Sequence, residues 1–214
     1  NYDWDFKVEG DWMTVTREGD VLTVAAGKNT GKDPLEGTIA ITGGKDANTM
    51  TFPLPVSQSG YDENNMVFIY SLPADKKEIV LPLAGTVNCT VDWGDGTKEE
   101  TIVAAPTHTY DVAGEYVVTV SGEVTALASN STKFTTEKKD YLVRVKQWGK
   151  TGLTSMEQAF YSYENLTRIP DDIAHSFDEV TTFAKAFGSC KKLEEIPAGL
   201  FKNAAKATSF KETF

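Results

Sequence analysis

The chain has 214 residues, with 31 acidic and 21 basic side chains, a formal net charge of −10, two cysteines and two histidines. Without a basic stripe it lacks the phosphate attraction that dominates nucleic-acid binding, so we expect no nucleic-acid partner. No apolar run approaches the roughly 18 to 20 residues that span a bilayer, and a zinc site of the usual Cys/His type is excluded, so we expect no membrane insertion of this segment and no cofactor.

The first zone, residues 1–60, predicts short strands separated by turns rich in Gly, Asn and Asp. Residues 12–26 favour a hairpin, and residues 38–42 alternate apolar and polar side chains. The strand over residues 50–58 carries two prolines on the face opposite its apolar side chains, which is typical of an edge strand. This spacing predicts a small antiparallel β-sandwich.

The second zone, residues 61–147, follows a polar stretch of the kind found at domain junctions. Its apolar residues alternate over longer strands, at Val67 and Ile69; Ile79, Leu81 and Leu83; Val87, Cys89, Val91 and Trp93; Tyr116, Val118 and Val120; and Tyr141, Val143 and Val145. The zone predicts a second antiparallel sandwich of immunoglobulin (Ig) type.

The third zone, residues 148–214, repeats with a period of 27 residues, and Phe160, Phe187 and Phe214 occupy the same phase. Apolar residues at i, i+3, i+6 and i+7, beginning at Leu153 and again at Val180, predict a helix in each copy. An Ile-Pro pair then ends that helix. The period predicts a short α/β solenoid of leucine-rich-repeat type with an incomplete last copy.

Three sequence signatures resemble known families, and together they cover nearly the whole chain. The resemblance of residues 1–60 to a BACON domain rests on Trp12, Leu22, Val24, Asn29, Thr30, Ile39, Ile41, Val56, Ser57 and Gln58, and the usual basic residue after the Asn-Thr turn is present only as Lys32. Residues 61–147 resemble a PKD-like domain through the run Val91 to Thr97, the run Thr107 to Tyr110, and Gly114 to Tyr116. From Val143 through Trp148 and Gly149 onward, the chain is similar to BspA-like leucine-rich repeats. Tyr163 stands where the next copy has Cys190, which indicates that the first copy caps the sandwich.

These resemblances imply a Bacteroidetes-type bacterial protein that is secreted or held at the outer cell surface, for example as a lipoprotein whose leader is not in this sequence. BspA-like repeats imply adhesion, PKD-like domains imply contacts or stalks, and BACON domains imply carbohydrate binding or spacing. None of the three brings a catalytic motif, so we expect no enzyme.

The sequence therefore predicts a mostly β, multidomain protein with two Ig-like sandwiches followed by a short solenoid. We expect a non-catalytic, monomeric surface protein whose repeats recognise a protein of a host or neighbouring cell, or a polysaccharide. One alternative is a carbohydrate-binding accessory module of a glycan-utilisation system. Another is the non-catalytic end of a longer secreted enzyme.

A carboxylate cluster provides the first candidate site. Asp92 and Asp95, with His108 and Asp111 nearby, contain the oxygen ligands that Ca²⁺ prefers and an acid/base pair. The Asp and Gly residues of the same segment are also a strong turn sequence, in which Asp side chains accept hydrogen bonds from neighbouring backbone N–H groups. We favour the turn and keep calcium as the alternative.

Aromatic side chains provide the second candidate, because exposed rings are stacking platforms for ligands. Tyr161 and Tyr163 replace Gly188 and Cys190 at equivalent phases of the repeat, which predicts that at least Tyr161 is more exposed than the repeat requires. Trp4 is either a core residue or part of an exposed ridge. The ligand-contact hypothesis thus names Tyr161, Tyr163 and Trp4.

Overall fold

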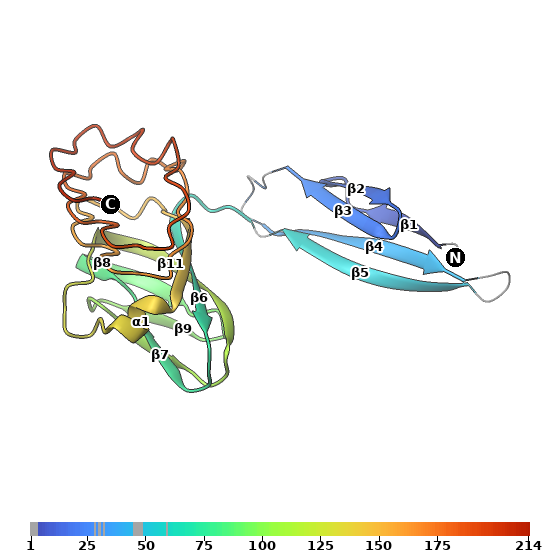
Figure 1. The fold of residues 1–214 in the computed structure, drawn as a ribbon, viewed down its shortest axis with the longest axis horizontal. Coiled ribbons are helices and arrows are strands. Elements are labelled where there is room, and N and C mark those ends of the chain that lie inside the picture. The colour runs from blue at the N-terminus through green and yellow to red at the C-terminus, as the bar shows by residue number, and fades with distance from the viewer. Residues whose placement is uncertain (1–3, 28, 30, 32, 45–48, 59) are drawn as a thin grey trace. The chain divides into compact units, whose positions relative to one another are not determined.

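The computed structural model describes residues 4–27, 29, 31, 33–44, 49–58 and 60–214. The prediction of a mostly β chain is confirmed: the described residues form several antiparallel sheets and one five-residue helix (Figure 1). The chain divides into two compact units, Asn1–Asp62 (unit 1) and Glu63–Phe214 (unit 2).

Unit 1 contains a three-stranded sheet and a separate hairpin. The sheet order is β1-β4-β5, from β1 (Trp4–Glu9), β4 (Leu35–Gly43) and β5 (Met50–Gln58). The hairpin pairs β2 (Met13–Glu18) with β3 (Val21–Ala26), as the sequence predicts. The predicted edge position of the proline-bearing strand is also confirmed, because β5 lies at the end of its sheet.

The core of unit 1 is small. Ile39 is fully buried and Met13 is 7 % exposed, whereas Met50, Phe52 and Leu54 of β5 are 62, 59 and 48 % exposed. Phe52 and Leu54 pair with Ile41 and Ile39 on the same face of the sheet, so burial falls off from β4 to the edge strand. Among the residues that carry the BACON resemblance, Thr30 and Lys32 lie outside the described residues.

Unit 2 begins with a sandwich of seven strands. Its larger sheet has the order β12-β6-β11-β8-β9 and its smaller sheet pairs β10 with β7. The strands are β6 (Asn65–Leu72), β7 (Lys77–Val80), β8 (Leu83–Asp92), β9 (Lys98–Thr101), β10 (Thr107–Tyr110), β11 (Gly114–Leu127) and β12 (Leu142–Gln147), and α1 (Thr136–Asp140) precedes β12.

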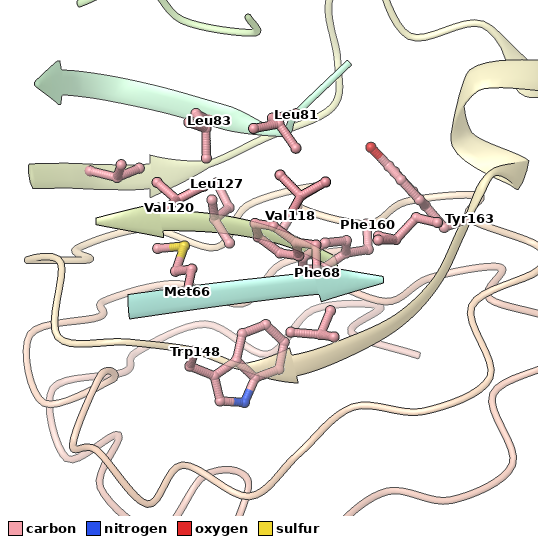
Figure 2. Packing of buried hydrophobic residues seen from close by; sticks show 14 of the residues in the cluster. Met66, Phe68, Leu81, Leu83, Val118, Val120, Leu127, Trp148, Phe160 and Tyr163 are labelled. Atoms are coloured by element: carbon pink, nitrogen blue, oxygen red, sulfur yellow. The ribbon is translucent and has the colours of Figure 1, made fainter. Parts of the chain in front are cut away.

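The inner face of the large sheet is apolar and fully buried at Met66, Phe68, Val118 and Val120 (Figure 2). Successive side chains of β6 point to opposite faces, so Val67 and Ile69, the residues that the sequence pattern indicated, lie on the outer face, where Val67 is half-buried and Ile69 is buried. The apolar residues of β8 are buried as expected.

The last strand differs from the predicted alternation of Tyr141, Val143 and Val145. It begins at Leu142, and its register against β6 shifts twice, between Leu142 and Arg144 and between Val145 and Gln147. Because a bulge reverses the face on which the next side chains lie, Leu142 and Val145 are the buried residues of β12 and Arg144 is exposed.

Residues 151–214 form irregular coils of turns (Figure 1), and the helices predicted for each copy are wrong. The backbone N–H groups of Gln158 and Phe160 donate to Ala184 O and Ala186 O in the next copy, at 2.9 and 2.7 Å. Positive φ angles at Gln158 and Ser162 turn the chain within the copy. The hydrogen bonds therefore run between copies instead of along a helix.

The 27-residue period places equivalent residues of successive copies in contact. Phe160 and Phe187 stack with ring centroids 5.7 Å apart, and Phe187 and Phe214 with centroids 5.6 Å apart. Isolated parallel bridges join Ser155 to Thr182 and Thr182 to Ser209. Each copy thus packs against its neighbours, as the repeat pattern predicts.

The first copy lies directly against the sandwich. A parallel bridge joins Ala126 of β11 to Ser155, and the Leu127 N–H donates to Ser155 O at 3.0 Å. Trp148 is 2 % exposed, packs against Phe160 and Phe177, and donates from Nε1 to Pro170 O at 2.9 Å. Sandwich and coils consequently share one hydrophobic core, in which Trp148, Phe160 and Tyr163 lie among the sandwich side chains (Figure 2).

Candidate functional site

Tyr161 lies on the surface of the first coil, between the two positive-φ residues Gln158 and Ser162. Its side chain is 38 % exposed. The ring lies over Gly188 of the second coil, where a Cβ atom would come within 3.1 Å of Tyr161 Cδ2. Because Gly188 has no side chain, the Tyr161 ring can lie against it. This agrees with the sequence, in which Tyr161 of the first copy corresponds to Gly188 of the second.

Two lysines approach the Tyr161 ring. Lys139 Nζ, from α1, lies 6.0 Å from the ring centroid and Lys185 Nζ, from the second coil, lies 5.9 Å from it. Lys139 also donates to Tyr161 O at 2.9 Å, and burial lowers the pKa of its ammonium group. The ring and the two ammonium groups form a small surface, the Tyr161 site, that offers stacking area and hydrogen-bond donors.

Tyr163 is not part of that surface. It is 1 % exposed and packs edge-on against Phe160, with centroids 5.5 Å apart. Burial raises the pKa of its hydroxyl group strongly. The prediction of a ligand contact at Tyr163 is therefore wrong for this structure: the tyrosine fills the space between the first coil and the sandwich.

Trp4 belongs to unit 1 and is half-buried. The Arg17 guanidinium lies 3.6 Å from the centre of its ring, and Trp4 Nε1 donates to Asp20 Oδ1 at 3.2 Å. One face of the indole is thus already occupied by a cation. The residue is neither fully in the core nor a bare ridge, and its role as a ligand contact stays a prediction.

The carboxylates of the calcium hypothesis are engaged within the turn. Asp92 Oδ1 accepts from the Gly94 N–H at 3.0 Å and its Oδ2 lies 3.0 Å from Lys98 Nζ. Asp95 Oδ1 accepts from the N–H and hydroxyl groups of Thr97 at 3.0 and 2.6 Å, and Oδ2 lies 2.7 Å from His108 Nε2.

This arrangement fits the turn. Within the described ranges, no group of three or more His, Cys, Asp or Glu side chains converges as metal ligands would. The His108 ring stacks on Trp93 with centroids 4.8 Å apart, and Tyr110 donates to Trp93 O at 2.7 Å. The cluster anchors the β8 turn to β10.

Asp95 should contribute stability that depends on pH. Burial raises the pKa of its carboxyl group, but hydrogen bonds from Thr97 and His108 outweigh it and lower the pKa to about 2. Since the unfolded pKa is about 3.9, the contribution is present above pH ~4 and lost as the pH falls toward 2. We expect Asp95→Asn to reduce the free energy of unfolding by about 1–2 kcal/mol at pH 7.

Urea denaturation of both chains at pH 7, 4 and 2.5 measures this difference. The difference in the free energy of unfolding between the wild type and Asp95→Asn should be smallest at the lowest pH. A gap that stays constant over this range would show that the carboxylate charge has no part in holding the turn.

Sequence reasoning missed the two lysines of the Tyr161 site. The repeat contains a signal for Lys185, because this residue has the same position in the second copy as Gln158 has in the first, three residues before Tyr161. Lys139 reaches the ring from α1, in the sandwich segment, and the sequence carries no signal for that approach.

Comparison with known proteins adds no relative: a scan of protein-family models, a search of curated proteins and a search of solved structures each found no match. In the part of the chain that the structure describes, no helix has the length and apolar character required to cross a membrane.

Proposed function

We propose that this chain is a non-catalytic recognition protein of a bacterial cell surface, secreted or held at the outer surface. In this proposal the BACON-like and PKD-like regions are a stalk, and the leucine-rich-repeat-type region binds a surface protein or polysaccharide of a host or neighbouring cell. The sequence resemblances provide the cellular setting.

One observation carries the proposal: a partly exposed aromatic ring on the first coil has two lysine ammonium groups near it, one from α1 and one from the second coil. Tyr161 is held over Gly188 by the close approach of the second coil, and Lys139 and Lys185 approach its ring. A tyrosine provides a large contact area at low entropic cost, and it is held here on a packed scaffold. Such a surface suits a glycan or a protein segment better than a small metabolite.

The carbohydrate-accessory function remains a second candidate, because Trp4 in unit 1 offers another partly exposed ring. In that case, binding would depend on Trp4 and would survive changes in the coils.

We expect Tyr161→Ala to weaken binding of the full chain to its ligand about tenfold. Stacking of a nucleic-acid base on an aromatic ring contributes roughly 1–3 kcal/mol, and tyrosine is enriched among the residues that dominate binding interfaces. The measurement is a glycan array together with immobilised matrix proteins, probed with the wild type, Tyr161→Ala and Trp4→Ala. Ile102→Ala, which truncates a side chain that is 79 % exposed in the sandwich, is the control.

Loss of binding in Tyr161→Ala alone supports recognition by the repeats, and loss in Trp4→Ala alone supports the accessory module. If the wild type binds a ligand and both variants retain its full affinity, the Tyr161 site is not the recognition surface.

A further inference from the structure

The outer face of the large sheet in unit 2 carries a groove of about 400 Å³ at its border with the first coil. Strand register places Val117 of β11, Ile69 of β6 and Arg144 of β12 in one row across this face. Val117 is 46 % exposed although it lies on a central strand. Together with Pro170, which also lines the groove, these residues form an apolar floor with a cationic side.

Two arginines lie side by side along the groove. An isolated parallel bridge pairs Arg144 with Arg168 of the first coil, and the Val145 N–H donates to Arg168 O at 3.0 Å. Like charges directly opposite each other are destabilising unless an anion lies between them or each has a counterion. Lys146 of β12 adds a third cation to the lining.

The counterions of these cations are few and exposed. Arg144 Nη2 lies 2.9 Å from Glu115 Oε1, and Arg168 Nε lies 3.4 Å from Glu194 Oε2, with side chains between 44 and 73 % exposed. The third cation, Lys146, is exposed. Three cations and one carboxylate line the groove, on a chain whose formal net charge is −10.

We infer that this groove, the Arg144–Arg168 groove, binds an acidic polysaccharide through the carboxylate or sulfate groups on its sugars. The planar guanidinium fork matches both anions, and a neighbouring pair of forks can hold one anion or two successive ones. Val117 and Pro170 then contact the C–H face of the sugar ring. The inference rests on the proposed recognition function and names a ligand class for it.

Backbone pairing favours a polysaccharide over an acidic peptide. An extended peptide that binds a sheet gains most of its affinity from main-chain hydrogen bonds at a free strand edge. Here β6 and β11 are paired on both sides, and the bridge to Arg168 covers the outer edge of β12. The groove therefore recognises its ligand through side chains, and the charged groups of the ligand provide the specificity.

The test uses the full chain and four polymers: polygalacturonate, dextran sulfate, neutral dextran and poly-L-glutamate. Binding is measured by biolayer interferometry at 20 and 150 mM salt. We expect the wild type to bind polygalacturonate or dextran sulfate, more weakly at high salt, and not to bind dextran. The double variant Arg144→Gln/Arg168→Gln should bind at least about tenfold more weakly.

Lys191→Gln/Lys211→Gln is the matched control, because it removes the same charge from side chains outside the groove. Val117→Glu is the second groove variant, since it adds a carboxylate without breaking an ion pair, and it should weaken binding to the same polymers. Melting curves verify that each variant is folded.

Equal losses in the control and in the groove variants would overturn the inference, as would binding of poly-L-glutamate alone or no binding of any acidic polymer at 20 mM salt. If the acidic polymers bind normally to Tyr161→Ala but not to the groove variants, the groove binds them independently of the Tyr161 site. If instead Tyr161→Ala loses binding and the groove variants retain it, the proposed function stands and the groove is not the binding site.

Discussion

Replacing Trp148 with alanine is expected to lower the free energy of unfolding of unit 2 by about 3–5 kcal/mol, the range for removing a large buried aromatic side chain. Trp148 is 2 % exposed and contacts three phenylalanine rings from two coils: Phe160, Phe177 and Phe187, at centroid distances of 6.0, 5.2 and 6.1 Å. Its truncation also leaves Pro170 O without the indole N–H donor. Urea denaturation followed by far-UV circular dichroism measures the loss.

Phe214→Ala is the control for this change. Phe214 stacks on Phe187 with centroids 5.6 Å apart, but it is 49 % exposed, so its removal vacates less buried space. We expect a loss of about 1 kcal/mol. If Trp148→Ala costs no more than Phe214→Ala, the indole does not hold the coils to the sandwich.

Replacing Gly149 with alanine is expected to cost about 3–4 kcal/mol, because two effects add. Gly149 has φ = 76°, a left-handed conformation that disfavours a side chain. A Cβ atom there would lie 2.4 Å from the backbone carbon of Asn65 and 2.6 Å from the Met66 nitrogen. Since those atoms belong to β6, the junction would have to move away from the sheet. Thermal and urea denaturation both report the change.

Gly152→Ala separates the two effects. Gly152 has φ = 93°, but a Cβ atom at that position would meet nothing within 4 Å. We expect a cost of about 1–2 kcal/mol from conformation alone. Equal costs at the two glycines would mean that the close approach to Asn65 contributes nothing.

The sequence predicted the strand-rich zones because alternation of apolar residues has a direct physical cause in a half-buried strand. The buried series of Val87, Cys89, Val91 and Trp93 is the plainest case, with exposures of 5, 6, 0 and 1 %. The 27-residue period predicted contacts between equivalent residues for a similar reason, since each copy covers its apolar face only with the next.

The helix prediction was wrong because apolar spacing does not distinguish a helix from a coil that returns at the same interval. Both place Met156, Ala159 and Phe160 on one side, and the difference lies in where the backbone N–H groups donate. That choice depends on the neighbouring copy. The apolar spacing within a single copy therefore does not predict which carbonyl groups accept these hydrogen bonds.

The candidate sites were predictable only in part. Comparing the copies singled out Tyr161 and Tyr163 by the same argument, but Tyr163 faces the sandwich and is buried, whereas Tyr161 lies over Gly188. The Arg144–Arg168 groove required the register shift in β12 and the parallel bridge to the first coil. Neither leaves a local pattern in the sequence.

The central structural claim is that sandwich and coils form one cooperative unit, so that surface residues of both are held in a fixed relation. Hydrogen exchange under native conditions tests it at the Val118 N–H of β11 and at the Phe160 N–H, which donates to Ala186 O at 2.7 Å. We predict opening free energies that agree within about 1 kcal/mol. A Phe160 amide that opens several kcal/mol more easily than Val118 would show that the coils unfold while the sandwich stays folded, and would contradict the claim.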